Sequence, residues 1–217
     1  YRENDPMGGY DPYSSSKGCV EILIDSYRNS FINPKDYKTH GKSLASVRAG
    51  NVIGGGDWSN DRIVPDCIRA LKKNKDIEIR NPNAVRPWQH VLEPLSGYLL
   101  LATMMYEDGI SYCSGWNFGP NGDSIVSVGY IVKTIIKEWG SGKYLDISRK
   151  NALHEANLLK LDCTKSKTYL KWFPKLNVDE AIKLTVDWYK SFKDKDMFDL
   201  CVNQIKDYVS KRSEEVI

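Results

Sequence analysis

The chain has 217 residues and a formal net charge of +3, with 41% hydrophobic and 27% charged residues. These values are ordinary for a globular protein with room for one large domain or one and a half small ones. The small net charge and the interleaving of basic with acidic residues argue against nucleic-acid binding. No apolar run approaches the ~20 residues that a transmembrane helix needs.

Cysteine and histidine usage excludes two further classes of protein. The five cysteines lie far apart and form no C-x-x-C, and the three histidines lack Cys, Asp or Glu partners at ligand spacing. This pattern predicts neither a disulfide framework nor a metal site, and it favours reduced thiols in a cytoplasmic protein.

Apolar periodicity and turn residues predict an alternation of strands and helices. The chain starts with Tyr1 and a turn-rich stretch, and we interpret it as lacking its N-terminal part. A helix is expected from Ser14 to Phe31, with Val20, Ile24 and Tyr27 on one apolar stripe. The other expected elements are a loop at 33–42, a buried strand at 43–57 ending in glycines, a helix at 62–75, a strand at 76–82, a connector at 85–90, an apolar helix at 91–106, a strand at 115–120, an amphipathic helix at 126–139, a strand at 144–149, a short helix at 159–174, a surface helix at 177–194 and a polar tail. Such an alternation indicates an α/β fold.

Tyr13 and Lys17 stand four residues apart at the start of the first helix. This spacing puts them on one helical face, where the ammonium favours the phenolate form of the tyrosine. Such a tyrosine can take up or give a proton near neutral pH. Tyr189 and Lys193 have the same spacing, but we interpret them as a solvated helix face because no Gly-rich loop follows. Tyr13 and Lys17 are followed by a buried strand that ends in "RAGNVIGGGD".

Four stretches together carry a family resemblance: "YSSSK", "RAGNVIGGGDW", "RPWQHVLEPLSGY" and "WNFGP". They resemble the extended short-chain dehydrogenase/reductase family and, within it, the CDP-glucose 4,6-dehydratases, over nearly the whole chain. The resemblance implies the C-terminal part of a Rossmann-type α/β fold with a smaller mixed α/β substrate-binding lobe. Residues 1–54 would belong to the NAD-binding domain and 55–217 mainly to the substrate lobe, with a helix at 88–108 returning to the Rossmann domain. The family's G-x-x-G-x-x-G loop is not found in these residues, so we expect the chain alone to bind NAD weakly and to be inactive.

The resemblance also implies roles for individual residues. Tyr13 would be the base for the C4 hydroxyl of the sugar, and Lys17 would activate it and bind the nicotinamide ribose of NAD. The implied reaction converts CDP-glucose to CDP-4-keto-6-deoxyglucose, for deoxysugars of a surface polysaccharide such as the O-antigen of lipopolysaccharide. Asn51 and Val52 would lie at the cofactor. The substrate-binding candidates are Asn51, Arg62, Ile63, Val64, Arg80, Arg86, Asn117 and His154.

Several of these candidates have a physical basis of their own, and some stay ambiguous. A guanidinium binds phosphate oxygens in pairs, which favours Arg86 for the pyrophosphate, while Arg80 fits an exposed strand end equally well. Backbone N–H groups at a helix start favour an anion beside Arg62. Trp88 suits stacking or core packing, and His90 is interpreted as structural. His154 and Glu155 match family positions near the sugar's rim.

Two other functions remain open from the sequence. One is a different nucleotide-sugar epimerase or reductase of the same family, and the other is a catalytically silent binding or assembly fragment. In the family the helix at 14–31 packs against a symmetry mate, so the resemblance also implies a homo-oligomer, either a dimer or a tetramer. Neither nucleic acid, membrane nor metal is expected as a partner.

Overall fold

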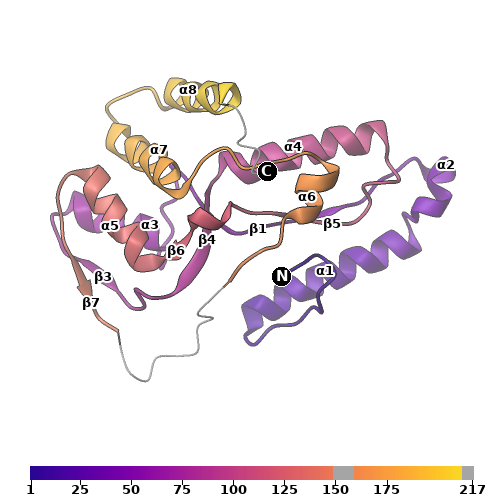
Figure 1. Cartoon of the computed structure of the whole chain (residues 1–217), viewed down its shortest axis with the longest axis horizontal. Helices are drawn as coiled ribbons and strands as arrows, with labels where there is room; N and C mark the ends of the chain where they lie inside the picture. The colour runs from indigo at the N-terminus through magenta and orange to yellow at the C-terminus, as the bar shows by residue number, and fades with distance from the viewer. Residues whose placement is uncertain (149–158, 212–217) are drawn as a thin grey trace. The chain divides into compact units, whose positions relative to one another are not determined.

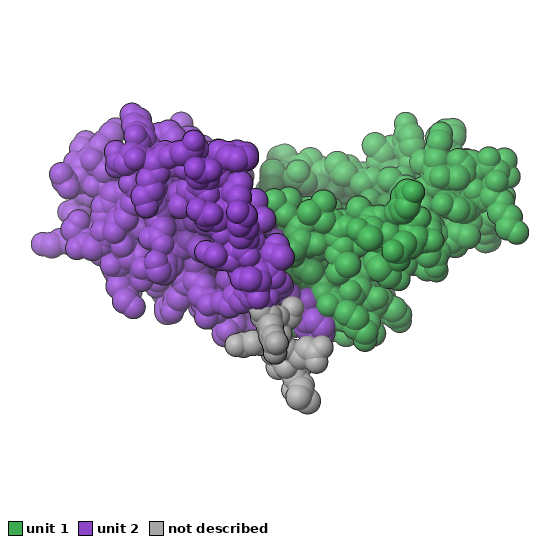
Figure 2. All heavy atoms as spheres, turned by 90° about the horizontal axis from the view of Figure 1, so that it is seen from above, with its two compact units in different colours: residues 1–49, 95–118, 161–172 green, residues 50–94, 119–160, 173–217 purple. Residues whose placement is uncertain are grey.

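The computed structural model describes residues 1–148 and 159–211 (Figure 1). They form two compact units, coloured separately in Figure 2. Unit 1 comprises residues 1–49, 95–118 and 161–172, and unit 2 comprises residues 50–94, 119–160 and 173–217. The expected assignment of residues 1–54 and 55–217 to an NAD-binding domain and a substrate lobe stays a prediction.

Helices and strands alternate along the chain, which confirms the predicted α/β class. The strands are β1 (Ser46–Ala49), β2 (Asn51–Ile53), β3 (Ile77–Ile79), β4 (Val85–His90), β5 (Gly115–Phe118), β6 (Ile125–Ser127) and β7 (Tyr144–Asp146). The helices are α1 (Pro12–Ser30), α2 (Tyr37–His40), α3 (Ile63–Lys72), α4 (Leu92–Glu107), α5 (Val128–Trp139), α6 (Thr164–Tyr169), α7 (Val178–Ser191) and α8 (Met197–Ser210), with short 3₁₀ turns η1 (Pro34–Asp36) and η2 (Gly122–Ser124).

Helix α1 begins two residues before the predicted start, because Asp11 caps it. The Asp11 carboxylate accepts hydrogen bonds from the backbone N–H groups of Tyr13 at 2.9 Å and Ser14 at 3.0 Å. Pro12 occupies the first helical position, where its missing N–H costs nothing. Tyr13 therefore stands in the first turn of a helix with a fixed start.

The predicted strand at 43–57 is divided in two by Gly50. Strand β1 pairs in parallel with β5 in unit 1, whereas β2 pairs in parallel with β4 in unit 2. The first half of the stretch therefore belongs to unit 1, and its Gly-rich end belongs to unit 2.

The connector predicted at 85–90 is wrong: these residues form β4, the middle strand of the sheet β2-β4-β6. Pro87 and the polar side chains argue against a central strand in the sequence, because proline has no backbone N–H to donate to a neighbouring strand. Each half of β4 pairs with a different neighbour: residues 85–87 pair with β6, and residues 88–90 pair with β2. Residues Pro87 to His90 are buried.

Each unit has its own hydrophobic core. In unit 2, apolar side chains of α3, α5 and α7 pack with β3 and β4 around Ile68, Ile131 and Ile182, each no more than 1% exposed. In unit 1, Trp116 and Phe118 of β5 pack with Leu101, Leu170 and Trp172.

Two predicted surface features differ from the structure. Helix α7 was expected to be a surface helix, yet it buries one full face, including Val186 and Tyr189. Helix α1 shows the opposite: of its residues only Gly18 is buried, and the expected apolar stripe of Val20 and Tyr27 is half exposed. Helix α8 forms in the polar tail, for which a helix was one of two interpretations of the sequence.

Candidate active site

The Tyr13–Lys17 pair lies on the exposed side of α1 in unit 1. The Lys17 Nζ atom is 5.5 Å from the centroid of the Tyr13 ring, as the four-residue spacing predicts. The Tyr13 side chain is 67% exposed, and its phenolic oxygen has no hydrogen-bond partner among the described residues. The pair is therefore accessible to a ligand, with a cation placed beside a phenol that could donate or accept a proton.

The second Tyr–Lys match has no such geometry, and its predicted place on a solvated face is wrong. Tyr189 is 1% exposed and its hydroxyl donates to the Asp57 carbonyl oxygen in unit 2. Burial raises the pKa of Tyr189 to about 12. Helix α7 ends at Ser191, so Lys193 lies beyond it. Tyr189 faces the core because the amphipathic pattern of α7 places it on the same face as Ile182 and Val186.

The cofactor and substrate candidates on the sheet of unit 2 occupy neighbouring strands. Asn51 and Val52 of β2 lie opposite Trp88 and Gln89 of β4. Arg86 precedes this register by two residues on β4, and its Nη1 donates to the Val85 carbonyl oxygen at 2.9 Å. Val52 is 43% exposed, whereas Asn51 and Arg86 are half-buried. Their roles with ligand stay predictions.

A second group of candidates meets at the start of α3, also in unit 2. Arg62 is the N-cap residue, and Ile63 and Val64 form the first turn. Arg80, directly after β3, joins this group because its Nη2 lies 3.2 Å from Asp61 Oδ1. The Val64 side chain is 4% exposed, so a ligand could be contacted only by its backbone. Arg62 and Arg80 are exposed beside the helix start, which is suited to an anion.

Asn117 of β5 is fully buried in unit 1 and binds backbone groups. Its Nδ2 donates to the carbonyl oxygens of Tyr1 and Asp162, each at 3.1 Å, and its backbone N–H donates to Glu3 Oε1 at 2.9 Å. These contacts fasten the first residues of the chain to the strand. Substrate binding by Asn117 stays a prediction. His154 and Glu155 lie outside the described residues.

Trp88 and His90 are core residues of unit 2. Trp88 is 4% exposed and its Nε1 donates to the Val126 carbonyl oxygen at 3.0 Å, so it packs rather than stacks on a ligand. His90 is 2% exposed, and burial lowers the pKa of its imidazole to about 4. A neutral, buried imidazole agrees with the structural interpretation of His90.

The Gly-rich loop after β2 is fixed against α7 by close packing at Gly55. A methyl group built on Gly55 would lie 2.1 Å from Trp188 Cγ, well inside contact distance. Trp188 cannot move freely because its ring stacks on Phe192 with a centroid distance of 5.3 Å and its Nε1 donates to Cys201 Sγ. The glycine here is required for packing of loop against helix.

Gly55→Ala is therefore expected to lower the free energy of unfolding by about 1–3 kcal/mol, the usual cost of overpacking. Denaturant unfolding measures it. Gly122→Ala is the matched control, since a methyl group there meets nothing within 4 Å. Equal stability of the two variants would contradict this account of the loop.

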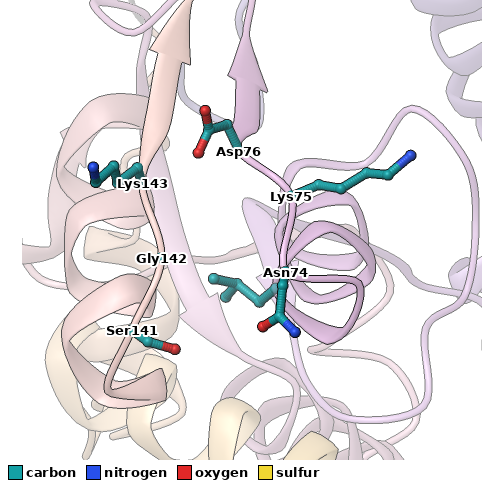
Figure 3. Close-up of a pocket in the computed structure, with 7 residues that line it drawn as sticks. Asn74, Lys75, Asp76, Ser141, Gly142 and Lys143 are labelled. Carbon is teal, nitrogen blue, oxygen red and sulfur yellow. The ribbon is translucent and has the colours of Figure 1, made fainter.

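Unit 2 contains a pocket at the end of α3. It has a volume of about 320 Å³ and lies in unit 2, between the end of α3 and the α5–β7 connection, where it is lined by Leu71, Asn74, Lys75, Asp76, Ser141, Gly142 and Lys143. Figure 3 shows the ammonium ends of Lys75 and Lys143 pointing away from one another, so they do not converge on one ligand. None of the predicted site residues lines this pocket.

Two other kinds of site are not observed. Among residues 1–148 and 159–211, no three His, Cys, Asp or Glu side chains gather as a metal site would require. No helix in the described part of the chain has the length and apolar character needed to cross a bilayer.

Sequence comparison identifies the relatives of the chain. It is 48% identical over 211 residues to CDP-glucose 4,6-dehydratase of Salmonella typhimurium, covering 97% of this chain and 59% of that protein. The chain is homologous to part of this dehydratase. It is also 25% identical over 190 residues to dTDP-glucose 4,6-dehydratase of Streptomyces antibioticus, covering 87% of this chain and 51% of that protein. No protein-family model matches the chain. The resemblance to CDP-glucose 4,6-dehydratases that the motifs predicted is confirmed.

Solved structures show the same fold. dTDP-glucose 4,6-dehydratase from Bacillus anthracis, solved in complex with NAD, matches with a TM-score of 0.70 and 19% identity over 89% of this chain and 57% of that one. A UDP-galactose 4-epimerase matches with a TM-score of 0.67 and 20% identity over 86% of this chain and 55% of that one. As predicted, the chain shares the fold of these two enzymes, and it spans little more than half of their length.

Sequence reasoning missed two acidic residues that organise the fold near the candidates. Glu21 follows Lys17 by four residues on α1, and Glu93 follows His90 by three. Helical spacing could have drawn attention to Glu21, whereas the partners of Glu93 are distant in sequence.

Proposed function

We propose that this chain carries the Tyr–Lys machinery and part of the substrate site of an NAD-dependent CDP-glucose 4,6-dehydratase. The observation that carries the proposal is 48% identity to such a dehydratase across 97% of the chain. The placement of Lys17 Nζ 5.5 Å from the Tyr13 ring supports it, because the reaction starts with proton removal from a sugar hydroxyl.

Tyr13 acts in this proposal as the base for the C4 hydroxyl, and the Lys17 ammonium stands beside its ring to assist it. NAD, when bound, accepts a hydride from the sugar and returns it. The residues fit such a group, because the exposed Lys17 ammonium and Tyr13 hydroxyl leave donors available to a ribose and a sugar. Lys17 would hold the nicotinamide ribose, with Asn51 and Val52 as further cofactor contacts.

The substrate part of the proposal rests on arginines. Arg86 on β4 and the exposed Arg62 and Arg80 at the start of α3 supply the guanidinium groups that a nucleoside diphosphate requires. Asn51, Ile63, Val64, Asn117 and His154 complete the proposed substrate contacts. The product would be CDP-4-keto-6-deoxyglucose, a precursor of deoxysugars in a surface polysaccharide such as the O-antigen of lipopolysaccharide.

Arg86→Ala is expected to weaken the binding of CDP-glucose by about 1.5–3 kcal/mol, the scale of a lost charge-assisted hydrogen bond. The affinity for NAD should be nearly unchanged. Calorimetric titration measures both ligands, with the exposed Lys137→Ala of unit 2 as the matched loss of a cation. A fall in NAD affinity with unchanged CDP-glucose affinity would assign Arg86 to the other ligand.

The reaction itself is tested with protein expressed from the complete reading frame that encodes this chain. Incubation with NAD and CDP-glucose should yield the 4-keto-6-deoxy product, with dTDP-glucose and UDP-glucose turned over far more slowly. Inversion at C4 without loss of water would favour the epimerase alternative instead. Tight binding of CDP-glucose without any turnover would favour a binding or assembly module.

Self-association is the last part of the proposal. The exposed Ile22 and Leu23 of α1, with Phe31 at its C-terminal cap, offer an apolar surface to a second copy of the chain, as a homodimer or a tetramer would require. Sedimentation equilibrium tests it, and a monomer at micromolar concentration would contradict it.

A further inference from the structure

An ion pair one helical turn beyond the Tyr–Lys pair ties α1 to β1 within unit 1. Glu21 Oε1 accepts from Arg48 Nε and Glu21 Oε2 from Arg48 Nη2, both at 2.9 Å. Ser46, two residues before Arg48 on the same strand face, donates its hydroxyl to Glu21 Oε2 at 2.8 Å. Both charged side chains are mostly buried, with 22% of the Arg48 and 18% of the Glu21 side chain exposed. Both oxygens of the carboxylate therefore accept hydrogen bonds from β1.

The position of Glu21 on α1 connects this ion pair to the Tyr13–Lys17 pair. Tyr13, Lys17 and Glu21 follow each other at four-residue intervals, so they line one face of α1. A carboxylate four residues from a lysine is within reach of a side-chain ion pair on an isolated helix. In this structure Glu21 bonds to Arg48 instead, and Lys17 Nζ lies over the Tyr13 ring.

The other acidic side chains around α1 are engaged elsewhere. Asp11 caps the helix, and Asp25 pairs with Arg28 Nη1 at 2.9 Å. Arg28 is held by other groups, since its Nε donates to the Leu44 carbonyl oxygen at 3.0 Å, and its charge adds only a smaller lowering of the pKa of Glu21 than Arg48 does. The Arg48 guanidinium is the first cause of the lowered pKa of Glu21, so the carboxylate stays ionised and would compete for Lys17 if released.

We propose that Arg48 is a positioning residue for the catalytic pair: it holds the Glu21 carboxylate and thereby leaves the Lys17 ammonium to Tyr13. The inference rests on the proposed function in assigning catalysis to Tyr13 and Lys17. Whether the Glu21 carboxylate pairs with Arg48 or with Lys17 does not depend on which reaction the protein catalyses. Arg48 also donates to the Glu3 carbonyl oxygen at 3.2 Å, which fixes the guanidinium in place.

The first experiment measures the availability of Lys17 without any assay of activity. Competitive acetylation, read by peptide mass spectrometry, compares Lys17 with the exposed Lys38 in the same molecule. Arg48→Met should slow acetylation of Lys17 about twofold, the effect of one new ion pair at four-residue spacing. The double variant Arg48→Met/Glu21→Gln should restore the rate, and Glu21→Gln alone should leave it unchanged.

The second experiment measures turnover of CDP-glucose by the same variants in protein from the complete reading frame. Arg48→Met should lower kcat about tenfold with KM for the sugar nucleotide unchanged, as a misplaced catalytic group does. The double variant should recover most of kcat although its thermal stability stays as low as that of Arg48→Met. A purely structural role would leave both variants equally impaired.

The outcomes separate this inference from the proposed function. Restored acetylation in the double variant supports the inference even if no sugar nucleotide is turned over, in which case the proposed function alone fails. Unchanged acetylation of Lys17 in folded Arg48→Met, or equal slowing in both variants, overturns the inference. Should Arg48→Met fail to fold, Arg48→Lys keeps a single-point contact to Glu21 and should give an intermediate rate, whereas a wild-type rate overturns the inference.

Discussion

Tyr13→Phe is expected to lower the turnover of CDP-glucose by at least ~10²-fold, the usual scale for a lost acid/base. The phenylalanine keeps the ring beside Lys17 but has no proton to exchange. Folding should be unaffected, because the Tyr13 side chain is 67% exposed and its hydroxyl has no partner among the described residues. Steady-state kinetics on protein from the complete reading frame, together with thermal unfolding, measure both effects.

Two other Tyr→Phe variants serve as controls for the loss of a hydroxyl. Tyr169→Phe removes the hydroxyl of a tyrosine in the same unit that is 66% exposed, and it should change neither turnover nor stability. Tyr189→Phe should leave turnover nearly intact but lower the free energy of unfolding by about 1 kcal/mol, because the Tyr189 hydroxyl donates to the Asp57 carbonyl oxygen. Near-normal turnover of Tyr13→Phe would sink the assignment of the base.

The sequence predicted well those features that depend on neighbours in the chain. The start of α1 was predicted to within two residues, and the capping interactions of Asp11 that fix it reach only as far as Ser14. The four-residue spacing of Tyr13 and Lys17 on one helix face is likewise local. The family resemblance predicted the fold beyond these local features, because it rests on several motifs along the chain rather than on single elements.

The features that the sequence did not predict depend on contacts between residues far apart in the chain. Strand β4 contains Arg86, Pro87 and Gln89, and it is a strand only because β2 and β6 each pair with one half of it. The buried face of α7, with Tyr189 in the core, depends on packing against α5 and β4. Ligand contacts of the two units remain predictions for the same reason, since they depend on arrangements that no local pattern encodes.

Glu93 is the clearest case of a residue whose role depends on distant partners, and it gives a prediction of similar size. It is fully buried in the first turn of α4. Its Oε1 accepts from the backbone N–H groups of Lys175 at 2.9 Å and Leu176 at 2.7 Å, and its Oε2 accepts from the Tyr208 hydroxyl at 2.9 Å. One carboxylate therefore fastens the segment before α7 and helix α8, all within unit 2.

Glu93→Leu should lower the free energy of unfolding by about 3 kcal/mol or more. The substitution keeps apolar volume but leaves two backbone N–H groups and the Tyr208 hydroxyl without this acceptor, at about 1–3 kcal/mol for each buried group. Glu93→Gln should cost much less, because an amide oxygen can still accept from Lys175 and Leu176. Glu78→Gln on the exposed position of β3 is the control and should stay within about 0.5 kcal/mol of wild type.

The pH dependence of the same variants tests the charge on Glu93. Burial raises the pKa of this carboxyl above its ordinary value of 4.5, against the opposing hydrogen bonds from Tyr208 and Leu176. A raised pKa in the folded state means that the contribution of Glu93 to stability is fully present below pH 4.5 and is lost as the pH rises through the folded-state value. The stability of wild type relative to Glu93→Gln should therefore fall as the pH rises from 4 toward 7, because glutamine does not ionise. Denaturant unfolding across this range measures the difference, and a difference that rises with pH would mean that the hydrogen bonds to the ionised carboxylate outweigh its burial.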